Sequence, residues 1–130
     1  MLKEFVKSLE CVIIGCGVSE VNICKCEKML ELKFSDEYIS YLKEFGNIEV
    51  ASSELTGISE IKRLNVVDAT IEAKKNNTLV GKDMYVIERT NVDGIIIWQD
   101  KDGSIYETRG LNEPQKICKS LLQYIQEYCI

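Results

Sequence analysis

Three short runs of β-branched and aromatic residues, separated by turn signals, are the feature that most constrains how this chain can fold. The runs span residues 84–88, 95–99 and 104–108, and the segments 91–94 and 100–103 between them both end in Asp-Gly. Such runs favour β-strands, and Asp-Gly favours the backbone of a tight hairpin turn. The pattern therefore predicts a three-stranded antiparallel meander.

The second turn of this meander also decides which side chains share a face. Because side chains alternate along a strand, a loop of two or of four residues would place Trp98 on the same face as Ile105 and Glu107. Tyr106 would then lie on the other face, together with Ile97.

The first part of the chain has apolar residues at helical spacing and residue types that commonly cap helices. Apolar residues at helical spacing predict a first helix over residues 2–14, which ends near Gly15. Ser19 and Ser35 are preferred N-cap residues and predict two further helices, the second of which ends at Gly46. The meander is thus preceded by a helical region.

The segments between the helical region and the meander, and the segment after the meander, have both extended and helical patterns. Residues around 48–50 and 55–58 are predicted to be extended, and residues 66–75 helical. Pro114 suits a first helical turn, so a last helix is predicted from there to the end of the chain. Its expected inward residues are Ile117, Leu121, Leu122, Ile125 and Tyr128.

The absence of histidine excludes several classes of enzyme. A Ser-His-Asp triad, a Cys-His dyad, a His-ligated zinc ion and a histidine proton shuttle cannot be built. Carboxylates in the meander region could still supply an acid and base pair, although acids in turns are more often simply solvated. That alternative requires a concave pocket that holds two acids with separated pKa values.

The length of the chain indicates one domain, and its net charge limits the kinds of partner it can bind. The chain has 130 residues, the length of one domain, and carries 16 Lys and Arg against 21 Asp and Glu, a net charge of −5. This balance repels nucleic acid and anionic membrane surfaces and attracts a basic partner. No segment approaches the roughly 18 apolar residues of a membrane helix. The sequence predicts a protein partner, and neither nucleic acid nor membrane.

The six cysteines bear on compartment and on metal binding. The apolar run near the start is shorter than a signal peptide needs, so the cytoplasm, where thiols stay reduced, is the predicted location. Cys24 and Cys26 would diverge on a helix, and no second close pair completes a metal site. We expect no metal and no cofactor, and a buried, hydrophobe-like role for all six thiols. They are Cys11, Cys16, Cys24, Cys26, Cys118 and Cys129.

The pattern of the helical region resembles the SUKH superfamily, which includes a yeast cell-wall-synthesis regulator and many bacterial toxin-immunity proteins. The resemblance runs from about Val18 to Ile125, with Phe34-Ser35 where family members commonly have Leu-Pro. It is carried by Ile23, Glu27, Leu30, residues 34–38, Leu42, Gly46 and residues 54–58, 84–88, 103–106 and 120–122.

This resemblance implies an α+β fold, with one twisted, mostly antiparallel sheet packed with several helices. Residues 1–130 would form a single domain, in which 1–17 are an N-terminal helix and glycine-containing turn and 18–125 the family-like core. It also implies protein binding without catalytic residues. The leading hypothesis is a cytoplasmic immunity protein that neutralises a cognate toxin. The alternative is a regulatory scaffold in a signalling or cell-envelope assembly, and a homodimer is left open.

Seven residues of the meander are predicted to contact the partner, because protein-binding epitopes mix charged residues with aromatic anchors. Core packing is the alternative role for the two aromatic members. The seven are Glu88, Asp93, Trp98, Asp100, Asp102, Tyr106 and Glu107.

Overall fold

The computed structural model describes residues 1–130 and contains five α-helices and two antiparallel sheets, which confirms the predicted α+β class. The helices are α1 (Leu2–Ser8), α2 (Glu20–Leu30), α3 (Asp36–Phe45), α4 (Val66–Asn76) and α5 (Leu121–Tyr124), the last continued by a π-helical turn over Ile125–Cys129. The strands are β1 (Val12–Ile14), β2 (Ile48–Val50), β3 (Ser53–Glu54), β4 (Tyr85–Arg89), β5 (Ile95–Gln99), β6 (Ile105–Arg109) and β7 (Gln115–Cys118).

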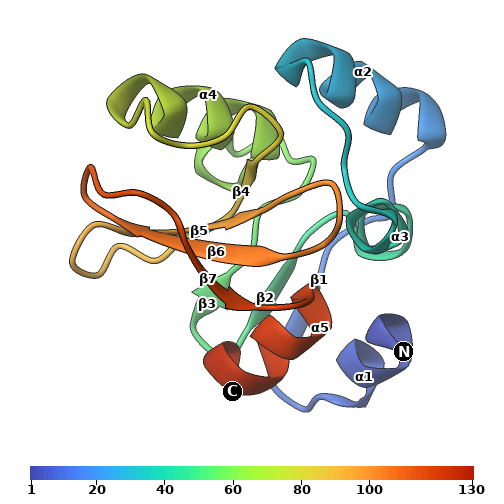
Figure 1. The fold of residues 1–130 in the computed structure, drawn as a ribbon. Coiled ribbons are helices and arrows are strands. Elements are labelled where there is room, and N and C mark those ends of the chain that lie inside the picture. The colour runs from blue at the N-terminus through green and yellow to red at the C-terminus, as the bar shows by residue number, and fades with distance from the viewer.

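The strands form two sheets rather than the single sheet expected. The orders are β1-β2-β3 and β4-β5-β6-β7, and every neighbouring pair is antiparallel (Figure 1). Thr56 joins them, because its N–H donates to the carbonyl oxygen of Ile87 and its hydroxyl to that of Val86, both over 2.7 Å. The predicted meander is confirmed, with β7 as a fourth strand.

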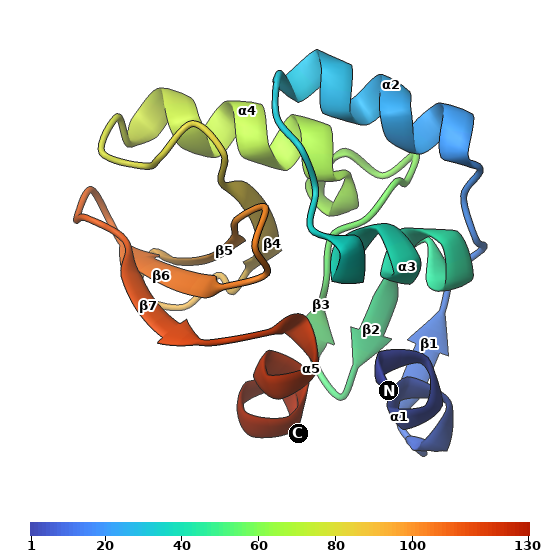
Figure 2. The same ribbon diagram turned by 45° about the vertical axis from the view of Figure 1, so that its right-hand side comes forward.

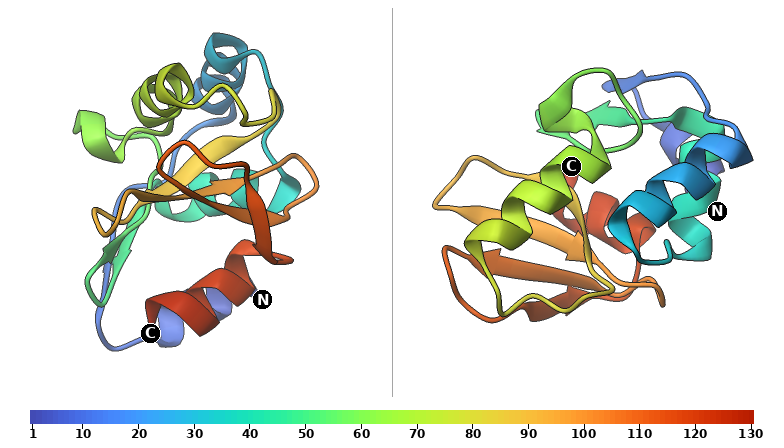
Figure 3. Two further views of the ribbon diagram at one scale, coloured as in Figure 1. Left: turned by 60° about the vertical axis from the view of Figure 1, so that its left-hand side comes forward. Right: turned by 90° about the horizontal axis from the view of Figure 1, so that it is seen from above.

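The helices cover the four-stranded sheet on both sides. In Figures 2 and 3, α2 and α4 lie side by side beyond one face, and α1 and α5 lie together on the opposite side. A small apolar cluster, which includes Ala69, Val86 and Trp98, fills the space under α4. The main core of 23 buried residues includes Ile97 and Ile105 of this sheet and extends to α2 and α4 through Ile23 and Val66.

Helix α3 supplies the aromatic centre of that main core. The Ser35 hydroxyl accepts the Tyr38 N–H over 3.0 Å at its start, as the cap predicted. Its inward residues Tyr38, Tyr41 and Phe45 are at most 1% exposed. Gly46 ends the helix with φ +74°, where a Cβ atom would meet the Cys16 carbonyl oxygen at 2.0 Å. Glycine is therefore required at this stop.

The predicted first helix is too long. Helix α1 ends at Ser8, and residues 12–14 form strand β1, which pairs with β2 in the register Ile13 to Glu49. Apolar spacing in this segment suits a helix or a strand equally well. The β-branched run and its distant partner β2 decide for the strand.

The predicted last helix also begins too early. Residues after Pro114 form strand β7, which pairs with β6, and the helix begins only at Leu121 with Ser120 as its N-cap. Leu121 and Ile125 are buried as expected, whereas Tyr128 is 50% exposed.

The predicted face assignment of the second hairpin is wrong. Trp98 lies opposite Tyr106 and shares its face, while Ile97 lies opposite Glu107. The loop has an odd length, because Asp100 N–H donates to the Ser104 carbonyl oxygen and Gly103, with φ +95°, completes a three-residue turn. An odd loop shifts the register by one residue and exchanges the two faces.

The cysteines divide into two groups, so the prediction that all six are buried is half wrong. Cys26, Cys118 and Cys129 are buried, whereas Cys11, Cys16 and Cys24 are exposed, and none forms a disulfide. Cys24 and Cys26 lie on different sides of α2, as their spacing predicted.

Candidate functional site

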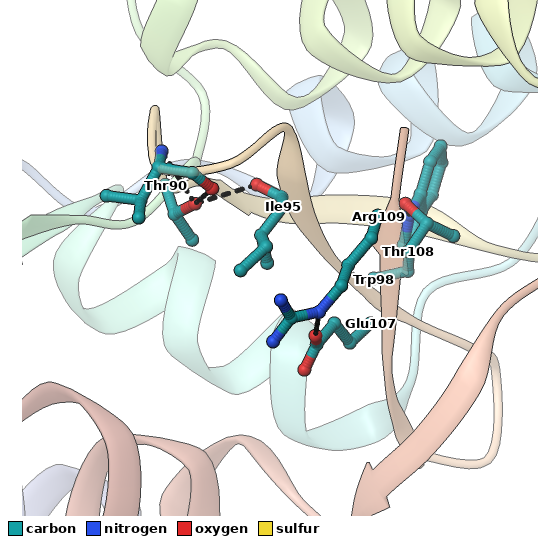
Figure 4. Close-up of polar contacts among 7 residues, drawn as sticks. Thr90, Ile95, Trp98, Glu107, Thr108 and Arg109 are labelled. Atoms are coloured by element: carbon teal, nitrogen blue, oxygen red, sulfur yellow. Dashed lines mark hydrogen bonds and ion pairs between the residues drawn. The ribbon is translucent and has the colours of Figure 1, made fainter. Parts of the chain in front are cut away.

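The structure brings together only part of the predicted seven-residue surface. Asp100, Asp102 and Tyr106 lie at the β5–β6 turn, and Asp93 lies in the β4–β5 turn at the other end of β5. Five strand residues at about 3.3 Å each separate the two ends by roughly 17 Å. The Thr90 hydroxyl holds the β4–β5 turn by donating to the Ile95 carbonyl oxygen over 2.8 Å (Figure 4).

Trp98 is a core residue. Its side chain is 0% exposed beneath α4, and its indole N–H donates to the Thr108 hydroxyl over 3.0 Å (Figure 4). A partner cannot reach this side chain in the folded protein. The structure thus shows the alternative role for Trp98, core packing.

Glu88 and Glu107 lie on the opposite face of the sheet from Tyr106. Glu107 accepts a hydrogen bond from the Arg109 side chain over 2.8 Å (Figure 4). Glu88 is 6% exposed and accepts the Tyr124 hydroxyl over 2.5 Å, so it fastens α5 to β4. Neither carboxylate lies with Asp100 and Asp102.

Asp100 shapes the β5–β6 turn from the inside. Its carboxylate accepts the N–H groups of Asp102 and Ser104 over 3.0 and 3.1 Å and the Tyr106 hydroxyl over 2.9 Å. Burial of Tyr106, together with the neighbouring Asp100 carboxylate, raises the pKa of this phenol. Asp100 therefore positions the turn, while Asp102 on the same turn is exposed.

A polar groove of about 450 Å³ lies beside this turn, where the β5–β6 turn meets the starts of α3 and α5. We call it the hairpin groove. Three carboxylates and two ammonium groups line it, and no apolar residue does. Its lining is Ser35, Asp36, Glu37, Lys101, Asp102, Gly103, Lys119 and Ser120.

Glu37 and Gln99 hold the wall of the hairpin groove rigid. The Glu37 carboxylate accepts the N–H groups of Leu121 and Leu122 over 2.7 and 3.1 Å, which satisfies the free donors at the start of α5. The Gln99 amide donates to Glu37 and to the Gly103 carbonyl oxygen, both over 3.0 Å.

The other end of the Gln99 amide reaches the core. Its oxygen accepts the Tyr85 hydroxyl over 2.9 Å and the Ser35 hydroxyl over 3.2 Å. Gln99 is 0% exposed, so one fully buried side chain links α3, β4 and the hairpin turn. Through Glu37 the same network reaches α5.

Sequence reasoning did not assign the groove residues Glu37, Lys101 and Lys119 or the buried Gln99 to a site. Gln99 carries the one available signal, because it is a polar residue at the end of the apolar run 95–98. A buried amide in such a place needs several hydrogen-bond partners. Those partners come from distant parts of the chain.

Burial of Glu88 gives a pH prediction. Burial raises the pKa of Glu88 above its ordinary 4.5, so the folded protein binds this proton more tightly than the unfolded chain. Stability contributed by this group is present below pH 4.5 and is lost as pH rises through the folded pKa. Glu88→Gln should abolish that loss. The amide oxygen of the substituted side chain can still accept the Tyr124 hydroxyl.

The measurement is the difference in unfolding free energy between Glu88→Gln and wild type, from urea titrations at pH 4.5 to 7. We expect the variant to gain on wild type as pH rises, and the exposed, non-titrating control Gln126→Leu to show no such trend. Burial also raises the pKa of Tyr124 and that of Cys129, the latter to about 12, so both stay neutral throughout. A flat difference would show that the pKa of Glu88 is the same in the folded and unfolded states and would contradict this prediction.

The structure supplies neither a metal site nor a membrane span. No three Cys, Asp or Glu side chains come close enough together to hold a metal ion. None of the helices combines the length and the apolar character that crossing a bilayer would require.

The fold and its groove define the class as a small α+β domain of two antiparallel sheets with a rigid polar groove between a hairpin turn and two helix starts. The family model described as SMI1-KNR4 cell-wall (SUKH_5) matches residues 2–130, so the chain belongs to the SUKH family. The resemblance over residues 18–125 is confirmed, and the match also includes α1 and β1. Comparison with the curated proteins finds no match.

Proposed function

We propose that this protein is a non-catalytic immunity protein, which binds the toxic domain of a cognate polymorphic toxin and blocks it. Membership of the SUKH family supports a protein-binding role. The net charge of −5 would accelerate encounter with a basic toxin domain.

The observation that carries this proposal is the hairpin groove. Its rim presents Asp36, Lys101, Asp102 and Lys119, while the buried Gln99 network fixes the backbone beneath them. Charged groups on a preorganised backbone select a partner with little loss of conformational freedom. Of the predicted seven residues, Asp102 alone lines this groove, while Tyr106 packs against the apolar cluster under α4.

We place this function in the cytoplasm. Cys11, Cys16 and Cys24 are exposed and unpaired, a state that a reducing compartment preserves. The proposed partner is a basic protein domain, with no cofactor, nucleic acid or membrane involved.

A second candidate is a regulatory scaffold in a cell-envelope or signalling assembly. The description of the matching family names the cell wall, which favours this alternative. Co-expression with the C-terminal domain of a large secreted protein encoded beside this chain's gene, once identified, separates the two roles. Rescue of growth and a stable complex are expected for immunity, and absence of rescue would favour the scaffold.

Charge reversal in the hairpin groove tests which surface binds. The double variant Asp36→Lys and Asp102→Lys should weaken the complex by about 10-fold or more, because it sets like charges against a basic partner. Both side chains are exposed, so the fold should tolerate the change. The measurement is titration calorimetry or rescue at graded toxin expression.

The double variant Glu60→Lys and Glu113→Lys provides the matched control, because it makes the same charge change on exposed loops outside the groove. It should bind as wild type does, apart from a small change in association rate. Equal loss in the control and in the groove variant would mean that net charge matters and the groove does not.

A further inference from the structure

Strand β1 forms a free edge of the three-stranded sheet. Its only strand partner is β2, and Figures 2 and 3 show no element beyond it on its outer side. A free edge presents unpaired backbone N–H and C=O groups to any strand that can approach.

The register shows which groups are unpaired. Ala51 N–H donates to the Cys11 carbonyl oxygen over 3.0 Å, and Gly15 N–H donates to that of Asn47 over 2.9 Å. Residues 11, 13 and 15 therefore direct their backbone groups toward β2. Val12 and Ile14 direct theirs to the open side, symmetrically about Ile13.

The side chains of this edge are apolar and uncharged. Ile13 is 65% exposed and Ile14 is 41% exposed. No charged residue occurs between Glu10 and Glu20. Proteins usually protect such edges with lysine, proline or a bulge, and β1 has none of these.

We propose that β1 pairs with β1 of a second copy of this chain, in antiparallel orientation, with Ile13 on the two-fold axis. Val12 would exchange N–H···O bonds with Ile14 of the other copy, and the symmetry axis repeats the pair. The exposed Ile13 side chains would then contact each other across the axis.

The uncharged strand favours its own copy over the basic toxin domain proposed above. A basic partner gains nothing from a surface without carboxylates, whereas a second β1 meets no charge and matches the free backbone groups in register. Pairing over so short a strand buries much less than the roughly 800 Å² per partner of a stable complex. The dimer should therefore dissociate on dilution.

Sedimentation velocity of the full chain over a concentration series tests this pairing. Wild type should shift from monomer to dimer as concentration rises, whereas Ile13→Lys should stay monomeric, because it sets two ammonium groups face to face. Ile61→Lys is the matched control, since Ile61 is 51% exposed and lies outside β1, and it should dimerise as wild type does. Thermal unfolding should show both variants folded.

Cross-linking gives a second readout, which accumulates even a weakly populated dimer in covalent form. In a background of Cys11→Ser, Cys16→Ser and Cys24→Ser, the thiols introduced by Ile13→Cys would lie on Cα atoms about 4.5 Å apart, within disulfide range. Mild oxidation should yield a covalent dimer for Ile13→Cys and not for Ile61→Cys.

Three results would overturn the pairing. The first is a wild type that stays monomeric, with equal cross-linking of the two cysteine variants. The second is a dimer that persists in Ile13→Lys. The third is a wild type that is monomeric on its own, together with loss of toxin binding in Ile13→Lys. The last would assign the edge to the toxin. Dimerisation by β1 with no rescue of growth would leave this inference standing and remove the proposed immunity function.

Discussion

Replacing Gln99 by leucine is expected to lower the free energy of unfolding by about 3 kcal/mol, because it leaves several buried polar groups without a partner. Tyr85 loses its acceptor, and Glu37 and the Gly103 carbonyl oxygen lose a donor. Leucine has a similar volume, so packing changes contribute little. Urea denaturation at pH 7 measures the loss.

The exposed Gln126 supplies the control for this change. Gln126→Leu should alter the unfolding free energy by less than about 0.5 kcal/mol, as surface substitutions usually do. If Gln99→Leu costs no more than this control, the hydrogen bonds of the buried amide are not what holds the turn. Toxin binding by the folded fraction of Gln99→Leu should also fall, because the wall of the hairpin groove loses its support.

Trp98→Ala should cost about 3–5 kcal/mol of unfolding free energy, the range for removal of a buried aromatic side chain. Trp98 is the largest fully buried side chain, and its indole packs beneath α4. Trp98→Phe should cost less, because it keeps an aromatic ring in the core and leaves a smaller cavity, although the bond to Thr108 is lost. Chemical denaturation of both variants, followed by far-UV circular dichroism, measures the two losses.

Trp98 also tests whether the buried core and the partner-binding surface are separate. Trp98 is the only tryptophan, so its fluorescence should report unfolding and stay constant when a partner binds. Partner binding by folded Trp98→Phe should equal that of wild type. If Trp98→Phe lost partner binding without losing stability, Trp98 would be part of the partner-binding surface.

Elements with strong local signals were predictable from the sequence. Ser35 and Gly46 delimit α3 where their cap preferences place them, and α4 ends at Asn76 as expected. The Asp-Gly turns likewise predicted strands β4, β5 and β6. In each case the deciding interactions lie within a few residues of one another.

Elements decided by distant partners were not predictable. β1 and β7 have apolar spacings that also suit a helix, and they became strands because β2 and β6 offer them hydrogen-bonding edges. The division into two sheets follows from the same kind of long-range pairing. Local periodicity carries no information about such partners.

The candidate site was predictable only in part. Asp102 follows from the acidic hairpin, but the hairpin groove also needs Glu37 and Lys119, which lie far from the hairpin in the chain. Trp98 was misplaced because burial depends on α4, which packs over that face of the sheet. The sequence indicates which residue types lie on a surface, but it does not show which distant residues lie beside them.

The three-residue turn between β5 and β6 bears on how this family can vary in length. Inserting or deleting one residue there would turn Tyr106 towards the main core and drive Ile105, which is 0% exposed, under α4. Changes by two residues would leave every side chain on its present side. Homologous chains with the same core residues should therefore differ in the length of this turn by an even number of residues.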